Sequence, residues 1–317
     1  MAKKIDISVN PEFSYEIALV IPYAHWLHER GQLGKVSTVV GMKPFYFFTD
    51  NFVEKFDFRT VNNGYANMSS IPNDWIHHNA IGAIGRDYST LTPEEKESVN
   101  GVLDYTQWSP PNYKAHYAND EYRFGDKFIV IANRYNYEHN KPPRGYFNLE
   151  CLQYLFTELT AAGYHVIYKR PENTEFAIDE NEQVMLDNKL VLNGLVPSIG
   201  VLTDKELAIR TPNVHLLEAI PDNGYSYNEK QLRIFANASG FISMAGGNGI
   251  LSSYFGVPNI TYVTTSGELR DGYFGPNSYY RKLSGAEIYA IRNPETDIDK
   301  YGHDYSELFA TVKRVFL

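Results

Sequence analysis

Apolar and polar positions alternate at the start of the chain and then recur at helical spacing. Residues 4–9 alternate in the manner of a half-buried strand, and turn-forming residues follow over 10–15. From Glu16 onward the apolar positions have the spacing of a helix, and Pro22 is expected to kink this helix or to delay its start. Residues 36–40 are predicted to form a second strand. The chain therefore opens with strand, turn, helix and strand, which predicts a parallel α/β unit.

The pattern weakens over residues 49–122, where tryptophans, prolines and glycines interrupt it. Residues 92–95 have the proline and the acidic residues of a helix start, but no regular alternation of elements surrounds them. A chain of 317 residues, at about 150 residues per domain, is expected to form two domains. We place them at residues 1–122 and 123–317.

Strands and helices alternate clearly in the second half of the chain. Strands are predicted over residues 127–132, 165–168, 213–220, 240–244, 259–263 and 287–291. Helices are predicted over residues 149–162, 226–238 and 305–317, and Ser226 with Glu229 forms a capping box for the second of them. The sequence leaves open whether the closing helix packs back on the first domain. The fold class is α/β, with two Rossmann-like doubly wound domains facing a cleft.

Composition and charge exclude several classes of function. The chain is 43% hydrophobic and 21% charged, and 29 Lys and Arg against 38 Asp and Glu give a net charge of −9. This acidic balance lacks the basic footprint of nucleic-acid or anionic-lipid binding, and the apolar runs are too short to span a bilayer. Cys151 is the single cysteine, so an intrachain disulfide is excluded. Because no apolar leader follows Lys3 and Lys4, we expect a cytoplasmic protein.

Residues 241–250 carry the strongest chemical signal, because a strand there runs through Gly246-Gly247-Asn248-Gly249 into a helix. Free N–H groups beyond the carboxyl end of a parallel strand can hold a phosphate, and glycines let it approach the backbone. Ser243, on the strand itself, is included in this candidate phosphate site. The turn matches neither the P-loop nor the Gly-x-Gly-x-x-Gly fingerprint. A tight turn that needs glycines only for packing is the alternative.

Polar side chains also follow other strands of the second domain. Asn133 and Arg134 come directly after one strand, and Lys169 and Arg170 end the next. Such cations could clamp a diphosphate, although a surface salt bridge is the usual fate of a single arginine. Glu218, at the end of a later strand, is a candidate for accepting hydrogen bonds from ribose hydroxyls. The alternative is an ordinary solvated carboxylate.

Acidic and hydroxyl side chains lie at the corresponding edge of the first domain. Glu12, Ser14 and Tyr15 follow its first strand and are candidates for binding an acceptor. A carboxylate at Glu16 could remove a proton from an acceptor hydroxyl. An acid in the first turn of a helix is also favoured by the helix dipole alone.

The acidic pair Asp297 and Asp299 has the spacing of a metal-binding motif of nucleotide-sugar enzymes. It lies in a polar loop away from every predicted strand end, so we expect neither a metal nor a cofactor.

Together these features resemble the GT-B glycosyltransferases. The resemblance rests on the opening strand, loop and helix with an acid near the helix start, and on the second doubly wound half. It rests above all on residues 228–263, which include the segment 236–243, the Gly246-Gly247 turn and the Gly256-Val257-Pro258 step.

The resemblance implies metal-independent transfer of a hexose or pentose in glycan biosynthesis. A nucleotide-sugar would bind the second domain as co-substrate, and a glycan acceptor would bind the first. The leaving diphosphate would be held by Arg134, Lys169 or Arg170 together with the amides of residues 246–249. Glu16 would be the base if the enzyme inverts.

Two other classes of function stay open. A sugar-nucleotide epimerase has a similar two-domain fold and would need carboxylates and a histidine around the sugar, with His215 and Glu218 as candidates. A non-catalytic nucleotide- or glycan-binding protein would tolerate the loss of Glu16 and of the cations. Turnover of a Glu16→Gln variant separates a transferase from a binder, and conversion of a nucleotide-sugar without an acceptor indicates an epimerase.

Overall fold

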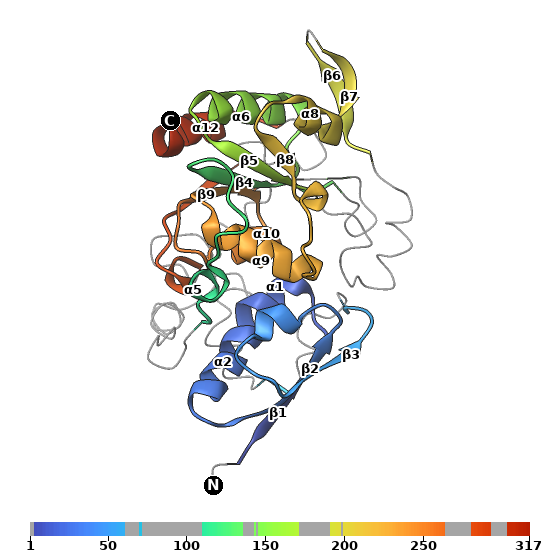
Figure 1. Cartoon of the computed structure of the whole chain (residues 1–317), viewed down its shortest axis with the longest axis vertical. Helices are drawn as coiled ribbons and strands as arrows, with labels where there is room; N and C mark the ends of the chain where they lie inside the picture. Colours follow the sequence, from blue (N-terminus) through green and yellow to red (C-terminus); the bar gives the residue numbers. More distant parts are fainter. Residues whose placement is uncertain are drawn as a thin grey trace, which may run out of the picture.

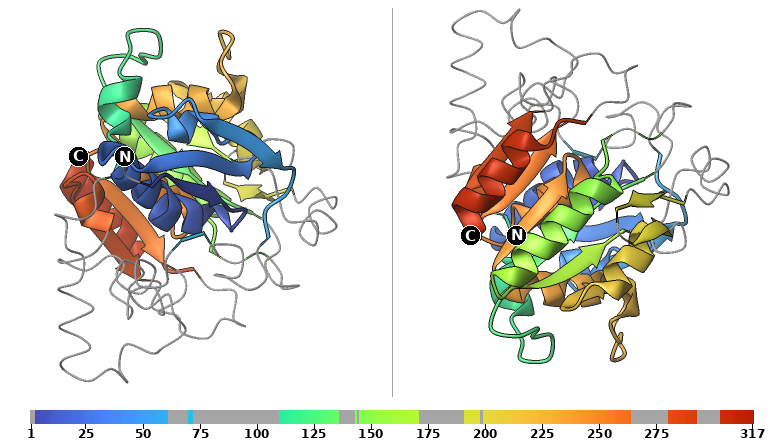
Figure 2. Two further views of the ribbon diagram at one scale, coloured as in Figure 1. Left: turned by 90° about the horizontal axis from the view of Figure 1, so that it is seen from below. Right: turned by 90° about the horizontal axis from the view of Figure 1, so that it is seen from above.

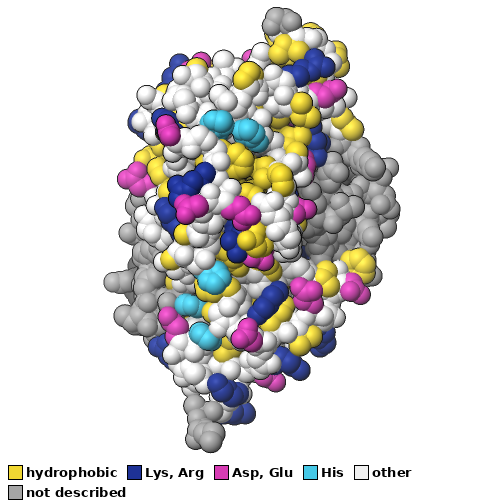
Figure 3. All heavy atoms as spheres, in the orientation of Figure 1, with side chains coloured by type: hydrophobic (Ala, Val, Ile, Leu, Met, Phe, Trp, Pro, Cys, Tyr) yellow, Lys and Arg dark blue, Asp and Glu magenta, His cyan; other side chains and the backbone are white. Residues whose placement is uncertain are grey.

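The computed structural model describes residues 3–60, 70–71, 110–135, 143, 145–170, 191–197, 199–263, 280–292 and 303–317. Within them, two parallel sheets lie in separate halves of the molecule (Figure 1). The predicted helix start at 92–95 and the pair Asp297 and Asp299 lie outside the described residues. No helix of the described part is long and apolar enough to cross a membrane. On the face drawn in Figure 3, the described Lys and Arg side chains are interspersed with Asp and Glu.

The N-terminal half contains the smaller sheet, in which three strands pair in parallel in the order β1-β2-β3. The strands are β1 (Ile5–Ser8), β2 (Leu33–Val39) and β3 (Phe52–Phe56). The first two correspond to predicted strands. β3 lies in the region where the pattern of apolar positions is weak, and the sequence analysis did not predict it.

One continuous helical segment connects β1 to β2. It consists of α1 (Phe13–Tyr15), a wider π turn η1 (Glu16–Val20) and α2 (Ile21–Glu29). Pro22 has no N–H to donate to the preceding turn, and the π turn stands directly before it. The helical segment therefore begins earlier than predicted, and Glu16 lies inside it rather than at its start.

The C-terminal half contains a six-stranded parallel sheet in the order β11-β10-β9-β4-β5-β8. Its strands are β4 (Phe128–Ala132), β5 (His165–Lys169), β8 (Val214–Leu216), β9 (Gly240–Met244), β10 (Asn259–Val263) and β11 (Ile288–Arg292). The predicted strand 213–220 is shorter than expected, because a helical turn η6 (Leu217–Ala219) ends it. From β4 the chain builds the sheet outward to β8 and then returns to β9 on the other side of β4. This reversal places the topological switch point between β4 and β9.

Helices cover both faces of this sheet (Figures 1 and 2). The outer face carries α6 (Leu149–Ala161), α8 (Asp204–Arg210) and α12 (Ser306–Phe316), and α9 (Tyr227–Asn237) and α10 (Gly247–Ser252) lie between the sheet and the N-terminal half. The closing helix α12 packs against β10 and β11 of the C-terminal sheet.

A hairpin of β6 (Asn193–Val196) and β7 (Gly200–Thr203) leads into α8, and the sequence analysis predicted none of these elements. The complete capping box belongs to α8, where Thr203 and Glu206 bond each other's backbone N–H groups. At α9, Ser226 accepts the Glu229 N–H at 3.2 Å, which is the first of the two bonds expected there.

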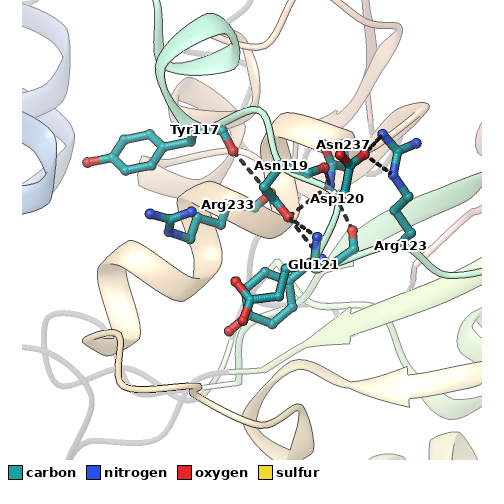
Figure 4. Close-up of polar contacts among 8 residues, drawn as sticks. Tyr117, Asn119, Asp120, Glu121, Arg123, Arg233 and Asn237 are labelled. Carbon is teal, nitrogen blue, oxygen red and sulfur yellow. Dashed lines mark hydrogen bonds and ion pairs between the residues drawn. The ribbon is translucent and has the colours of Figure 1, made fainter.

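The connection between the halves is attached to both of them. Tyr113, in α5 (Tyr113–Tyr117), donates its hydroxyl proton to the Phe45 carbonyl of the N-terminal half at 3.0 Å. Beyond α5, the Asn119 amide nitrogen donates to the Arg233 carbonyl of α9 at 2.9 Å (Figure 4). Asn237, also in α9, donates to the Asn119 carbonyl at 2.9 Å. The residues after α5 are therefore fixed to the C-terminal half.

Candidate functional site

The turns that follow β1 and β9 meet at the boundary between the two halves. Both α1 and η1 pack directly against α10 (Figure 1). The Phe13 ring lies so close to Gly247 that a Cβ there would come within 2.8 Å of the ring. One turn later, the Tyr254 hydroxyl donates to the Ile17 carbonyl. The glycine-rich turn (residues 246–249) and the turn that carries Glu12 to Glu16, called the acidic turn here, were predicted as separate features and belong to one region.

Gly246 is required by the geometry of the glycine-rich turn. Its φ is +115°, in the region that side-chain-bearing residues rarely adopt. The Arg134 Nη1 atom lies 3.6 Å from the position that a Cβ of Gly246 would occupy. The Arg134 Nε atom donates to the Gly145 carbonyl at 3.1 Å, which helps to hold the guanidinium beside the turn. The structure thus brings together Arg134 and the glycine-rich turn, and their predicted role in holding a diphosphate stays a prediction.

Lys169 reaches the same turn from β5. Its side chain is 1% exposed, and its Nζ donates to Asn248 Oδ1 at 2.6 Å and to Gln231 Oε1 at 2.8 Å. Because β4 lies between β5 and β9, the ammonium group crosses the carboxyl end of β4 at the switch point. These two partners are amide oxygens, which accept hydrogen bonds and so orient the ammonium group.

Ser243 supplies a buried hydroxyl beneath the turn. The residue is fully buried, and its Oγ has no hydrogen-bond partner among the described residues. The same Oγ lies 3.4 Å from the position of a Cβ at Gly249. An unsatisfied buried hydroxyl costs about 1–3 kcal/mol, so a ligand oxygen or a water that reached it would be favoured.

Two predicted phosphate-binding residues are directed elsewhere. The Asn133 amide donates to the Phe147 carbonyl at 3.0 Å and accepts the Phe147 N–H at 2.8 Å, so it holds the end of β4 to the next turn. Arg170 forms an ion pair with the fully buried Asp204 of α8. Successive side chains of an extended chain point to opposite faces, so Lys169 and Arg170 do not serve the same site.

His215 and Glu218, the candidates for epimerase chemistry, do not converge. His215 is hydrogen-bonded ring to ring with His165, the first residue of β5, at 3.0 Å. Glu218 forms an ion pair with Lys205 of α8 at 2.5 Å. Glu218 follows β8, which is an edge strand of the sheet. The strands β5 and β4 therefore separate Glu218 from the turn after β9. Its predicted role in nucleoside binding stays a prediction.

Glu16 is fully buried and its carboxylate is already engaged. Its Oε1 accepts from the Thr38 hydroxyl at 2.5 Å and from the Tyr46 hydroxyl at 2.9 Å, and its Oε2 accepts from Arg59 Nη1 at 2.6 Å. Burial, followed by the charge of Glu16, raises the pKa of Tyr46 well above its usual range. Arg59 also donates to the Pro11 carbonyl at 2.8 Å. Glu16 is therefore a buried carboxylate paired with Arg59, and its predicted role as the base stays a prediction.

The other residues of the acidic turn are half-buried. Glu12 precedes α1, and its side chain does not cap that helix. Burial raises the pKa of Tyr15, and the Glu12 carboxylate adds to this effect. Glu12 and Tyr15 therefore lie close together, and Ser14 stands between them in the chain.

Among the described residues, no group of three or more His, Cys, Asp or Glu side chains is arranged to hold a metal ion.

No family model and no curated protein matches the sequence. The fold, in contrast, is similar to solved structures. E. coli ADP-heptose lps heptosyltransferase II matches over 99% of this chain and 98% of its own, with a TM-score of 0.51 and 10% identity. The chain has a GT-B fold.

Other GT-B structures match over similar lengths. E. coli heptosyltransferase WaaC with ADP-2-deoxy-2-fluoro heptose covers 99% of this chain and 100% of its own, at TM-score 0.48 and 12% identity. A glycosyl transferase family 9 protein from Veillonella parvula covers 99% and 90%, at TM-score 0.43 and 11% identity. The resemblance predicted from the sequence is confirmed at the level of the fold.

Proposed function

We propose that this protein is a glycosyltransferase that moves a sugar from a nucleotide-sugar to a hydroxyl of a carbohydrate acceptor. The observation that carries the proposal is the switch point, where Lys169, Arg134 and the Ser243 hydroxyl surround one glycine-rich turn. Ligands of doubly wound sheets bind at this position. The acidic turn of the other half adjoins it, so a donor and an acceptor can be held by different halves.

In the proposed reaction, the acceptor oxygen attacks the anomeric carbon of the donor sugar and the bond from that carbon to the β-phosphate oxygen breaks. The diphosphate leaves with the electron pair, and its new charge would be neutralised by Lys169 and Arg134. Asn248 orients the ammonium group through the 2.6 Å bond. The same cations would make a metal unnecessary at the diphosphate.

The proton of the acceptor would pass to a carboxylate of the acidic turn. Glu12 is half-buried and precedes the helix, which leaves it open to a substrate. Glu16 would act as the base only after release from Arg59, which holds it at 2.6 Å. Transfer rates of Glu12→Gln and Glu16→Gln, each compared at equal folded fraction, decide between the two carboxylates.

A thermal-shift panel of ADP, UDP, GDP, CMP and dTDP, with and without magnesium, tests the donor site. ADP comes first, because the name of the heptosyltransferase with the same fold contains an ADP-sugar. A ligand at about 100 times its Kd stabilises the folded state by about 2.7 kcal/mol. We expect one diphosphate to stabilise the protein without magnesium and Lys169→Met to remove most of the shift.

Lys127→Met is the matched control, since Lys127 lies before β4, at the opposite end of the sheet. Its shift should equal that of the unmodified protein. A strict requirement for magnesium would overturn the metal-independent part of the proposal. The absence of any response would contradict the nucleotide site itself.

A further inference from the structure

A chain of side-chain amides connects Lys169 to the N-terminal half. The Gln231 oxygen accepts a hydrogen bond from Lys169 Nζ at 2.8 Å, and Gln231 Nε2 donates a hydrogen bond to Asn228 Oδ1 at 2.6 Å. Asn228 Nδ2 then donates to the Gly41 carbonyl at 2.7 Å. Gln231 and Asn228 are both buried, on successive turns of α9. We call this series, from Lys169 through Gln231 and Asn228 to Gly41, the amide relay.

The direction of the amide relay is determined by its two ends. An ammonium group only donates hydrogen bonds, and a backbone carbonyl only accepts them. Gln231 must therefore turn its oxygen to Lys169 and its nitrogen to Asn228. Asn228 must in turn present its nitrogen to Gly41. Neither amide can be reversed without placing two donors or two acceptors against each other.

The far end of the amide relay is anchored in the N-terminal sheet. Gly41 follows β2, and its N–H donates to the Glu54 carboxylate of β3 at 2.9 Å. Its φ of +80° favours glycine, and a Cβ there would lie 3.4 Å from Asn228 Nδ2. The direction of the Gly41 carbonyl is therefore fixed by the N-terminal sheet. It reaches Asn228 of α9 only where the two halves are in contact.

We propose that Asn228 and Gln231 are positioning residues, which make the placement of the Lys169 ammonium depend on contact between the two halves. Hydrogen bonds in a buried series polarise and orient one another, so the loss of the Gly41 carbonyl loosens Asn228, then Gln231 and then Lys169. The consequence for diphosphate binding rests on the proposed function. The amide relay itself does not.

Two variants interrupt the amide relay at different points. Asn228→Asp keeps an acceptor for Gln231 but places an oxygen against the Gly41 carbonyl. Gln231→Met keeps the length of the side chain and removes both of its hydrogen bonds. Tyr117→Phe is the matched control, because it removes a hydrogen bond between the N-terminal half and the segment that connects the halves, from Tyr117 to the Pro44 carbonyl, without touching the amide relay.

The first measurement uses the free protein and needs no nucleotide. The rate at which a small acylating reagent modifies Lys169 is followed by mass spectrometry, at a temperature equally far below each variant's Tm. We expect the rate to rise several-fold in Asn228→Asp and Gln231→Met and to stay unchanged in Tyr117→Phe. Unchanged rates in the first two variants, or an equal rise in all three, would overturn the proposal.

The second measurement is a double-mutant cycle on the affinity for the responding nucleoside diphosphate. Asn228→Asp should weaken binding several-fold when Lys169 is present and have no further effect in Lys169→Met. Equal losses in both backgrounds would show that Asn228 does not act through Lys169. If no nucleoside diphosphate binds the unmodified protein, the proposed function fails, and the labelling rates still decide the amide relay.

Discussion

The two turns that meet at the site use their buried polar groups in opposite ways. In the N-terminal half, the Glu16 carboxylate is paired with Arg59 and accepts hydrogen bonds from the hydroxyls of Thr38 and Tyr46. In the C-terminal half, Lys169 is oriented by amide oxygens and Ser243 Oγ has no partner among the described residues. The Glu16 carboxylate is thus occupied by partners within the fold, whereas a buried hydroxyl without a partner favours a ligand oxygen. A position beyond the carboxyl end of a strand is therefore not a binding site by itself.

Arg59→Leu should have the largest effect, because it leaves Glu16 as a buried charge without its cation. Removing one partner of a buried ion pair costs about 3–5 kcal/mol of the free energy of unfolding. Urea denaturation measures the loss. Lys55→Leu, which removes an exposed cation of β3, should change stability by less than about 0.5 kcal/mol. Similar small effects of both variants would contradict a structural role for the ion pair.

Thr38→Val removes a buried hydroxyl that forms a hydrogen bond, and Ser243→Ala removes one that has no partner among the described residues. Thr38→Val removes the hydrogen bond to the Glu16 carboxylate and should cost about 1.5–3 kcal/mol. Ser243→Ala removes a hydroxyl that has no partner among the described residues, so the free protein should be at least as stable as before, by up to about 1–3 kcal/mol more, while nucleotide binding weakens. Thermal unfolding and titration calorimetry test the pair. A large stability loss in Ser243→Ala would mean that the hydroxyl is already bonded in the free protein.

Gly246→Ala should strain the turn at the site. Forcing a side chain into its backbone conformation costs about 1–3 kcal/mol. Gly163→Ala is the matched control, since Gly163 has a φ of +82° and open space around a Cβ. Both variants should lower the Tm, and only Gly246→Ala should also lower nucleotide affinity. An equal loss of affinity in Gly163→Ala would assign the effect to general destabilisation.

The smallest expected effect is a pH dependence that originates away from the site. Burial, and then the neighbouring His165, lowers the pKa of His215. At His215 the folded state therefore binds fewer protons than the unfolded state as the pH falls. The contribution of His215 to the free energy of unfolding is complete above about pH 6.5 and declines below it. His215→Phe should flatten the decline in Tm between pH 7 and 5. The pH dependence of nucleotide affinity should be unchanged by the variant.

Local patterns in the sequence determined much of the C-terminal fold. Buried strands such as β4 and β9, and the glycine-rich turn, were predicted because apolar runs, caps and glycines act over a few neighbouring residues. The same kind of signal was available at α8, where Thr203 and Glu206 have the spacing of a capping box, and it was missed. The weak pattern around β3 carried no comparable local signal.

Tertiary structure decided which of the predicted site residues come together. Glu16 meets Arg59 across 43 positions of the chain, and Lys169 meets Asn248 across 79. Arg170, next to Lys169, turns to Asp204 instead. The sequence by itself determined where charged groups follow strands, because that depends on neighbours along the chain. It did not determine their partners, because these depend on how helices and sheets from distant segments pack.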